Sequence, residues 1–459
     1  MNRCLSAGVC VTMTVAAACP GGSAEGHDLQ SLIDAAPPGA TLRVAPGLYR
    51  GEVTVSKPLT LIGDGWPVID ARGLGSGLRI TAPDVVVRGL LVRHSGDSLD
   101  REDTGITVQA PRVQIIGNRL EDVLFGIVLR GADDSVVADN LVGAKALPIA
   151  RRGDGIRLWS SHRVRIERNR VVDGRDCVFW FSNQLLVRGN EMRRSRYGLH
   201  FMYADDSRVE ENRLEDNSVG VFLMYSARLA LRRNLMRGNA GPSGYGLGLK
   251  DMDGVEAEGN WIIGNRVGIF LDNSPSSIDV TQHFRGNLLA DNEVGIAFQP
   301  SVQRNVFSGN AFIDNGEAVA VRGEGRFTGN TWTVAGRGNY WSEYAGYDAQ
   351  RDGIGDVPFR RDNLFGGLMD RQPSLALFAG TPAVWMLDQA ARAFPVIRLE
   401  ARVIDTAPLI APPAIPPPPG AVPRPSAAPG TALGTALLMM AVLVVGSAFR
   451  PRHRQARPS

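Results

Sequence analysis

The sequence predicts an all-β protein built as a right-handed parallel β-helix with a helical cap at its N-terminal end. Two short phrases repeat through the middle of the chain in a fixed relation to each other. Glycine is abundant, at 53 residues, while aromatic residues make up only 7%. This composition suits a stack of short strands joined by many turns better than a helical bundle. With 44% hydrophobic and 21% charged residues, most of the 459-residue chain can bury a core.

The first phrase is an asparagine that follows a short β-like run. Consecutive copies lie between 20 residues apart (310 to 330) and 29 residues apart (140 to 169). The asparagines are Asn118, Asn140, Asn169, Asn190, Asn212, Asn234, Asn260, Asn287, Asn310 and Asn330. A repeat of this length is typical of solenoids, in which each copy forms one structural unit.

The second phrase is a glycine, an apolar residue, any residue and a second apolar residue. It begins at Gly105, Gly126, Gly155, Gly198, Gly220, Gly246, Gly268 and Gly295, and Cys177 takes the glycine position in one copy. In most copies the glycine follows the asparagine by eight residues, as from 190 to 198. Two phrases that stay in step over so many copies predict one repeating coil.

The copies must stack, because no single copy is long enough to bury its own inward side chains. Pairing each strand with its equivalent one coil along buries them all and gives a parallel β-helix, the solenoid of pectin-lyase-like proteins. We expect the asparagines at a bend between sheets, where their amides bond neighbouring coils in a ladder. We expect each glycine to allow a backbone arrangement that a Cβ atom would block. Both residue types are therefore assigned structural roles.

The two ends of such an array need covers. Asp28 to Ala36 predicts a short cap helix with Leu29, Leu32 and Ile33 on one face. Alternating strands are predicted to follow at 41–44, 53–55 and 59–62. At the far end, the aromatic and acidic segment 338–359 departs from the repeat.

The chain ends predict export and membrane anchoring. Residues 1–24 have the pattern of a signal peptide, with Arg3 before a short apolar run and cleavage after Ala18 or Ala24. Residues 25–405 are assigned to the β-helix domain with its caps, 406–430 to a Pro/Ala-rich linker, 431–449 to a single C-terminal transmembrane helix and 450–459 to a basic cytoplasmic tail. The tail is basic, so the positive-inside rule places the tail in the cytoplasm and the body outside, anchored to the membrane by the C-terminal helix.

Charge, cysteine and motif content exclude several functions. The net charge is +3, and four arginines in the last ten residues supply it, which leaves about −1 (3 minus 4) elsewhere and no basic body for nucleic acid. Beyond the predicted signal peptide Cys177 is alone, so no internal disulfide can form. The sequence has no phosphate-binding loop of the Gly-x-x-x-x-Gly-Lys type and no zinc-type Cys/His cluster.

Soft metal ligands fall on outward positions of the predicted solenoid. Positions two and four after each repeat glycine should face outward, which places His200 and Met202 on one face with Met224 one coil along. Met252 lies nearby in the next coil. Thioethers with an imidazole favour Cu(I) over hard cations, so His200, Met202, Met224 and Met252 are the predicted metal site. The alternative is an adhesive surface in an aromatic groove formed with Phe179, Phe181 and Phe222.

Acidic residues offer two rival interpretations. Parallel β-helices that cleave or epimerise polysaccharides need converging carboxylates, and the pairs here are Asp133 with Asp134, Asp205 with Asp206, and Asp251 with Asp253. They lie at turn positions with no base beside them, which argues against catalysis. Asp348, Asp352 and Asp356 have spacing suited to a calcium site, although a plain cap turn has the same pattern.

Several phrases together resemble the NosD family, the periplasmic maturation proteins of nitrous oxide reductase. They are Gly-Asp-Gly-Ile-Arg-Leu-Trp at 153–159, Tyr-Gly-Leu-His-Phe-Met-Tyr-Ala-Asp-Asp at 197–206, Gly-Val-Phe-Leu-Met-Tyr-Ser at 220–226, Gly-Leu-Gly-Leu-Lys-Asp-Met at 246–252 and Gly-Asn-Tyr-Trp-Ser-Glu-Tyr at 338–344. The likeness extends from the cap helix to about residue 394. A separate C-terminal anchor is a departure, since the permease is expected to hold such proteins at the membrane.

The resemblance implies an accessory role and no enzymatic activity. Members of the family are expected to work with an ABC ATPase and a membrane permease to assemble the copper-sulfur centre of nitrous oxide reductase. A membrane-anchored copper chaperone is a further expected partner, and Cu(I) is the expected transient ligand. A carbohydrate-binding or carbohydrate-cleaving β-helix is the alternative function.

Overall fold

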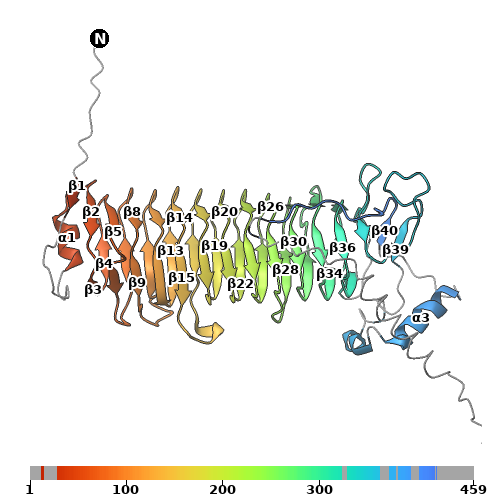
Figure 1. The fold of residues 1–459 in the computed structure, drawn as a ribbon, viewed down its shortest axis with the longest axis horizontal. Helices are drawn as coiled ribbons and strands as arrows, with labels where there is room; N and C mark the ends of the chain where they lie inside the picture. Colours follow the sequence, from red (N-terminus) through yellow and green to blue (C-terminus); the bar gives the residue numbers. More distant parts are fainter. Residues whose placement is uncertain are drawn as a thin grey trace, which may run out of the picture. The chain divides into compact units, whose positions relative to one another are not determined.

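The computed structural model describes residues 12–14, 28–322, 328–361, 368, 372–378, 381–393, 403–418 and 420. Residues 1–419 form one compact unit and residues 420–459 a second, and the fold described below belongs to the first. Its coils stack along one axis as a parallel β-solenoid, as predicted (Figure 1). Each complete coil contributes one strand to each of three parallel sheets, here named sheets A, B and C.

The strands of each sheet follow the coil order along the solenoid. Sheet A contains β1 (Thr12–Thr14), β2 (Thr41–Val44), β5 (Thr60–Gly63), β8 (Val86–Arg88), β11 (Gln114–Ile116), β14 (Val136–Ala138), β17 (Arg165–Glu167), β20 (Leu186–Arg188), β23 (Arg208–Glu210), β26 (Ala230–Arg232), β29 (Glu256–Glu258), β32 (Gln282–Arg285) and β35 (Asn305–Ser308). Sheet B contains β3 (Leu48–Arg50), β6 (Val68–Asp70), β9 (Leu91–Arg93), β12 (Arg119–Val123), β15 (Leu141–Ala144), β18 (Arg170–Val172), β21 (Glu191–Arg193), β24 (Arg213–Glu215), β27 (Leu235–Arg237), β30 (Trp261–Ile263), β33 (Leu288–Ala290), β36 (Ala311–Ile313) and β38 (Tyr340–Trp341). Sheet C contains β4 (Val53–Val55), β7 (Leu78–Ile80), β10 (Thr104–Val108), β13 (Phe125–Arg130), β16 (Ile156–Trp159), β19 (Asp176–Trp180), β22 (Tyr197–Met202), β25 (Val219–Met224), β28 (Tyr245–Lys250), β31 (Val267–Asp272), β34 (Val294–Phe298) and β37 (Glu317–Val321).

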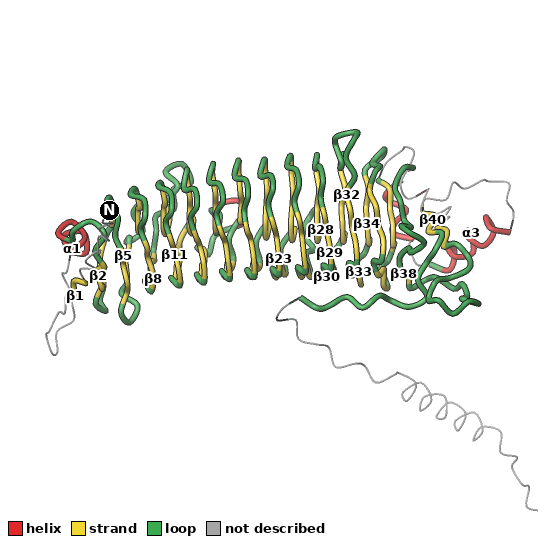
Figure 2. The backbone as a smooth tube through the Cα atoms, turned by 90° about the horizontal axis from the view of Figure 1, so that it is seen from above, coloured by secondary structure: helices red, strands yellow, loops and turns green. Residues whose placement is uncertain are grey.

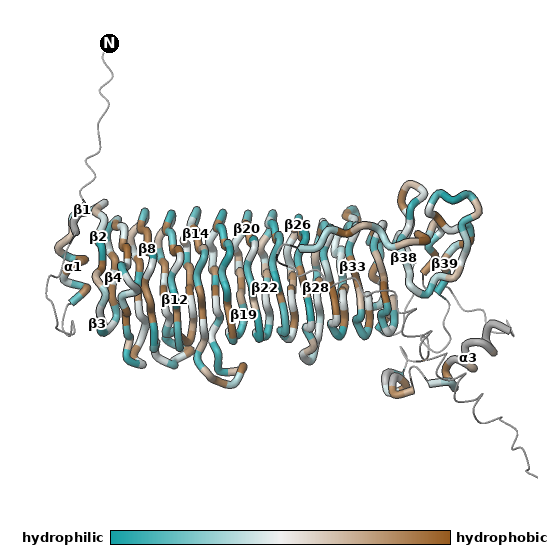
Figure 3. Tube along the Cα trace, in the orientation of Figure 1, coloured by the Kyte–Doolittle hydropathy of each residue, from teal (hydrophilic) through white to brown (hydrophobic). Residues whose placement is uncertain are grey.

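One coil shows how the sequence makes this structure. Strands β20, β21 and β22 place Val187, Met192, Leu199 and Phe201 inside the solenoid, where all four are fully buried. Every second residue of a strand points inward, so the same pattern in each coil builds one continuous apolar core. Apolar residues accordingly recur in coil after coil along the solenoid (Figure 3).

The asparagine ladder is confirmed, with one correction at its end. Each asparagine lies between sheets A and B, and the Asn212 side chain, for example, donates to the Asn234 Oδ1 at 2.9 Å and to the Val187 carbonyl at 2.9 Å. The predicted last member, Asn330, lies elsewhere and accepts from Asn305. Asn339 takes its place and accepts from Asn310, because the segment that starts at 338 continues the coil for one more strand, β38.

The prediction for Cys177 was wrong by one position. Cys177 pairs with Ile156, the residue after the repeat glycine, so it is an inward-facing core residue and fully buried. Strand β19 is one residue shorter than β22, and the register of this pair shifts between Asp176 and Val178 of β19. At true repeat glycines such as Gly198, a Cβ would lie 2.6 Å from the carbonyl oxygen of the glycine in the next coil. Glycine is therefore required there because the backbones of neighbouring coils come too close for a side chain.

The N-terminal cap is formed as predicted. Helix α1 (Leu29–Ala35) begins after Asp28, whose side chain accepts from the Gln30 N–H, and it buries Leu29 and Ile33 against the first coil. Within the predicted signal peptide the structure describes only β1, which pairs in parallel with β2.

The C-terminal end is closed by short elements and aromatic rings. Strand β39 (Phe359–Arg361) pairs there antiparallel with β40 (Val403–Asp405). The 3₁₀ helix η2 (Pro373–Phe378) and helix α3 (Pro382–Ala393) lie between these two strands in the chain. A further 3₁₀ helix, η1 (Ile149–Arg151), lies in a loop before β16. After β40 the chain runs back along the coils, and the Pro416 carbonyl accepts from the Trp261 indole at 3.2 Å (Figure 2).

The remaining predicted segments fall mostly outside the described residues. The structure describes 406–418 and 420 of the predicted linker, whereas the predicted transmembrane helix at 431–449 and the tail at 450–459 lie outside. Among the helices that are described, none is long and apolar enough to cross a membrane.

Candidate functional site

The candidate site lies on the outer face of sheet C, in the middle coils of the solenoid. Two outward columns run across strands β19, β22, β25 and β28. One column is Val178, His200, Phe222 and Gly248, and the other is Trp180, Met202, Met224 and Lys250. Paired strands are about 4.8 Å apart, so neighbouring members of a column are in direct contact range. The structure thus brings together three of the four predicted ligands.

His200 and Met224 already face each other. The His200 Nε2 atom lies 3.3 Å from the Met224 sulfur. The imidazole is only 6% exposed, because Tyr197 packs against its edge and Phe222 stacks on it at 6.0 Å between ring centroids. Met224 is half-buried on the outer face of sheet C.

Met202 lies directly beside Met224 in the same column. Its sulfur accepts a hydrogen bond from the Trp180 indole N–H at 2.8 Å. Like Met224, Met202 is half-buried. Two thioethers and one imidazole therefore share a small patch whose walls are aromatic.

A buried carboxylate lies behind the imidazole. The Asp176 Oδ2 atom is 3.8 Å from His200 Nδ1, which has no hydrogen-bond partner of its own. Burial would raise the pKa of Asp176, but the neighbouring His200 ring and the hydrogen bonds from Arg196 outweigh burial and hold the pKa below its usual range. An ionised carboxylate here favours the tautomer with the proton on Nδ1, which frees Nε2 to bind a metal.

Two residues expected near this patch face inward. Met252 is fully buried in the core, so its thioether does not reach the outer face. It lies at the corner after β28, in the position equivalent to Ser226 of the preceding coil. Phe179 is also fully buried and packs against Phe201 at 4.9 Å, because the one-residue shift at Cys177 turns it inward.

The same shift hid a residue that the sequence reasoning missed. Trp180, which a correct placement of Cys177 would have put in the outward column, lies between Trp159 and Met202. At the adjoining corner, aromatic rings stack from coil to coil, with centroids 5.2 Å apart for Phe181 with Tyr203 and for Tyr203 with Tyr225. Phe181 and Tyr203 are exposed.

The acidic pairs considered for catalysis are engaged in corner contacts. Arg163 donates to both Asp133 and Asp134 from the next coil. Arg228 donates to Asp206 in the same way at 2.6 Å.

The third acidic pair is held by polar neighbours. Asp253 accepts from Ser276 and Ser277, and Asp251 accepts from the Asn273 amide. Like the first two pairs, these carboxylates bridge successive coils, which suits a structural role.

The predicted calcium loop is a hydrogen-bonded turn. The Asp348 carboxylate accepts from the backbone N–H groups of Arg351, Asp352 and Gly353, while the Asp352 and Asp356 carboxylates accept from other backbone N–H groups. These bonds give calcium no support. Across the described residues no group of three or more His, Cys, Asp or Glu side chains is placed to hold a metal ion.

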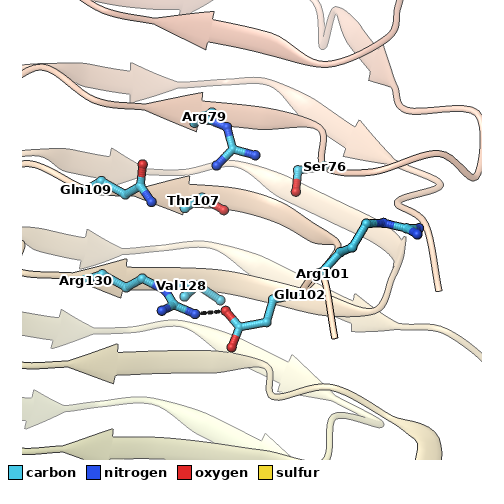
Figure 4. Close-up of a pocket in the computed structure, with 8 residues that line it drawn as sticks. All are labelled: Ser76, Arg79, Arg101, Glu102, Thr107, Gln109, Val128 and Arg130. Carbon is cyan, nitrogen blue, oxygen red and sulfur yellow. Dashed lines mark ion pairs between the residues drawn. The ribbon is translucent and has the colours of Figure 1, made fainter. Parts of the chain in front are cut away.

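A polar cavity of about 160 Å³ opens on sheet C closer to the N-terminal end. Its lining residues are Ser76, Arg79, Arg101, Glu102, Thr107, Gln109, Val128 and Arg130 (Figure 4). Each of its arginines pairs with a carboxylate: Arg79 with Glu52, Arg101 with Asp103 and Arg130 with Glu102. The cavity therefore carries no surplus positive charge for an anion.

Comparison with known proteins decides the family. The family model described as "Periplasmic copper-binding protein (NosD)" matches residues 142–346. A protein of Stutzerimonas stutzeri named "Probable ABC transporter binding protein NosD" is 30% identical over 387 residues, which cover 78% of this chain and 84% of that protein. This chain belongs to the NosD family. The Pseudomonas aeruginosa protein of the same name is 31% identical, over 82% of this chain and 89% of that protein.

Solved structures agree with the fold of this NosD family member. The catalytic unit of a GH87 alpha-1,3-glucanase from Streptomyces thermodiastaticus superposes with a TM-score of 0.54, covering 70% of this chain and 68% of the glucanase. Sequence identity in that alignment is 16%, so the likeness concerns the β-solenoid alone.

Proposed function

We propose that this NosD family member is a periplasmic, non-enzymatic accessory protein that receives Cu(I) on the outer face of sheet C. His200, Met202 and Met224 would hold the ion, and the copper would go to the copper-sulfur centre of nitrous oxide reductase. The protein would work with an ABC ATPase and permease, take copper from a chaperone and be held at the inner membrane by its C-terminal helix.

The observation that carries the copper proposal is the contact between His200 Nε2 and the Met224 sulfur. Zn²⁺ bonds to nitrogen at about 2.0 Å and to sulfur at about 2.3 Å. With such bonds and a tetrahedral angle at the metal, the nitrogen and sulfur atoms lie about 3.5 Å apart. The observed 3.3 Å is close to that separation, so one ion could bridge both atoms with little movement. Neutral thioethers bind the soft ion Cu(I) well and bind hard cations only weakly.

The names of the relatives support the ABC partners. Two relatives are named as ABC transporter binding proteins, and the family description names copper and the periplasm. The chain has no phosphate-binding loop, so ATP hydrolysis must come from another subunit.

The copper proposal is tested by anaerobic titration of the full-length chain with Cu(I) against a competing chelator. We expect the Met202→Leu, Met224→Leu double variant to bind Cu(I) at least tenfold more weakly, because leucine keeps the volume and removes the sulfur. Met386→Leu is the matched control, since Met386 is exposed on α3 and belongs to none of the strands of sheet C. No Cu(I) binding by the unaltered chain, or equal binding by the double variant, would overturn the proposal.

A further inference from the structure

Each thioether of the patch is contacted by a ring nitrogen from the preceding coil. His200 on β22 contacts Met224 on β25, and Trp180 on β19 donates its indole N–H to the Met202 sulfur on β22. The two contacts differ in kind, because an indole nitrogen can only donate a hydrogen bond and cannot bind a metal in this state. The indole N–H of Trp180 can therefore affect metal binding only through Met202, whose sulfur it contacts.

The indole itself is held firmly. Its ring packs edge-to-face with Trp159 at 5.6 Å, and the Arg157 guanidinium lies 5.3 Å from its centroid. Arg157 is fixed in turn by hydrogen bonds to Asp154 at 2.7 Å and to Glu102 at 2.8 Å, and only 9% of it is exposed. A buried ion-pair network thus sets the orientation of the Trp180 N–H.

Methionine has three rotatable side-chain bonds and needs such a constraint to present its sulfur in one place. We propose that Trp180 is a positioning residue that holds the Met202 sulfur beside Met224, so that two thioethers and one imidazole are arranged before Cu(I) arrives. A thioether sulfur has two lone pairs, so one accepts the indole N–H while the other stays available to the ion. This inference rests on the proposed copper-binding function.

The test is the Cu(I) affinity of the full-length Trp180→Phe variant, measured against the same chelator. Phenylalanine keeps an aromatic ring in the packing position and removes the N–H. We expect the Cu(I) affinity to fall about three- to tenfold, because the variant lacks the one hydrogen bond that holds the Met202 sulfur in place before the ion binds. Trp261→Phe is the matched control, because Trp261 lies on sheet B and its indole N–H donates to the Pro416 carbonyl, so losing it should leave Cu(I) affinity unchanged.

A double-mutant cycle separates positioning from general damage to the fold. In a Met202→Leu background, Trp180→Phe should have no further effect on Cu(I) affinity, whereas in a Met224→Leu background its effect should persist. Equal losses in all backgrounds would mean a merely structural role for Trp180 and overturn the inference.

The failure of this inference is distinguishable from failure of the copper proposal. If Trp180→Phe binds like the unaltered chain while the Met202→Leu, Met224→Leu variant binds weakly, only the positioning role of Trp180 is lost. If the unaltered chain binds no Cu(I), the copper proposal and this inference fail together.

Discussion

At the residue scale, the asparagine ladder shows how one side chain type can hold many coils together. Asn234 is fully buried, and its amide donates to the Val209 carbonyl at 2.8 Å and to the Asn260 Oδ1 at 2.9 Å. Its own Oδ1 accepts from the backbone and side-chain N–H groups of Asn212. One amide thus satisfies backbone groups at a bend where no strand pairing is available.

Replacing Asn234 with alanine should destabilise the protein by about 1–3 kcal/mol, because buried partners on both neighbouring coils lose their hydrogen bonds. Urea denaturation at pH 7 measures the change in free energy of unfolding. Gln109→Ala removes an exposed amide from the outer face of sheet C and serves as the control, with an expected change below about 0.5 kcal/mol. A loss for Asn234→Ala as small as that of the control would contradict the ladder's structural role.

At the element scale, charged side chains tie neighbouring strands of sheet B to one another. The Glu215 carboxylate on β24 is fully buried and accepts from Arg193 on β21, with Arg237 on β27 2.7 Å away and Arg213 on its own strand 3.3 Å away. Burial would raise the pKa of Glu215, but the three guanidinium groups outweigh it and hold the pKa below its usual range. One carboxylate therefore bridges three coils.

This arrangement predicts a pH-dependent stability. Because the folded-state pKa of Glu215 lies below the unfolded value, its contribution is present above about pH 4.3 and is lost as pH falls through the folded-state pKa. Glu215→Gln should therefore be less stable than the unaltered chain at pH 7, by about 3 kcal/mol, and the difference should shrink in strong acid. Urea titrations across that range measure it, with Glu258→Gln, an exposed carboxylate 3.8 Å from Arg232, as the control. A difference that stays constant with pH would refute this account.

The elements also show what the sequence could and could not predict. The coil repeat, the cap helix and the first strands follow from periodic patterns, because inward positions must be apolar and bends must satisfy the backbone. Cys177, Phe179 and Met252 were misplaced for a different reason. One coil is a residue short at Cys177, and a corner residue such as Met252 turns inward according to local packing, which spacing alone does not encode. Trp180 was missed as a direct consequence.

At the scale of the whole solenoid, stability depends on closing the ends, since each coil contacts only its neighbours. At the C-terminal end the core is plugged by stacked rings, with Trp341 lying between Phe312 at 4.2 Å and Phe359 at 4.5 Å. The asparagine ladder ends there as well. Asn339 donates its backbone N–H to Asp405 at 2.7 Å, so a carboxylate from β40 takes the place of the next asparagine.

Asp405 is suited to end the ladder because a carboxylate only accepts hydrogen bonds. Its two oxygens also accept from the Trp341 indole at 3.0 Å, the Thr333 hydroxyl at 2.8 Å and the Ala407 N–H at 3.2 Å. An Asp405→Asn variant would turn an amide NH₂ towards these donors, so we expect a loss of about 1–3 kcal/mol. The loss should come first as opening of the last coils, which hydrogen exchange would detect as faster exchange at Asn310 and Asn339 than at Asn212. Uniform acceleration along the solenoid would instead mean that the coils unfold as one unit and that Asp405 is no local cap.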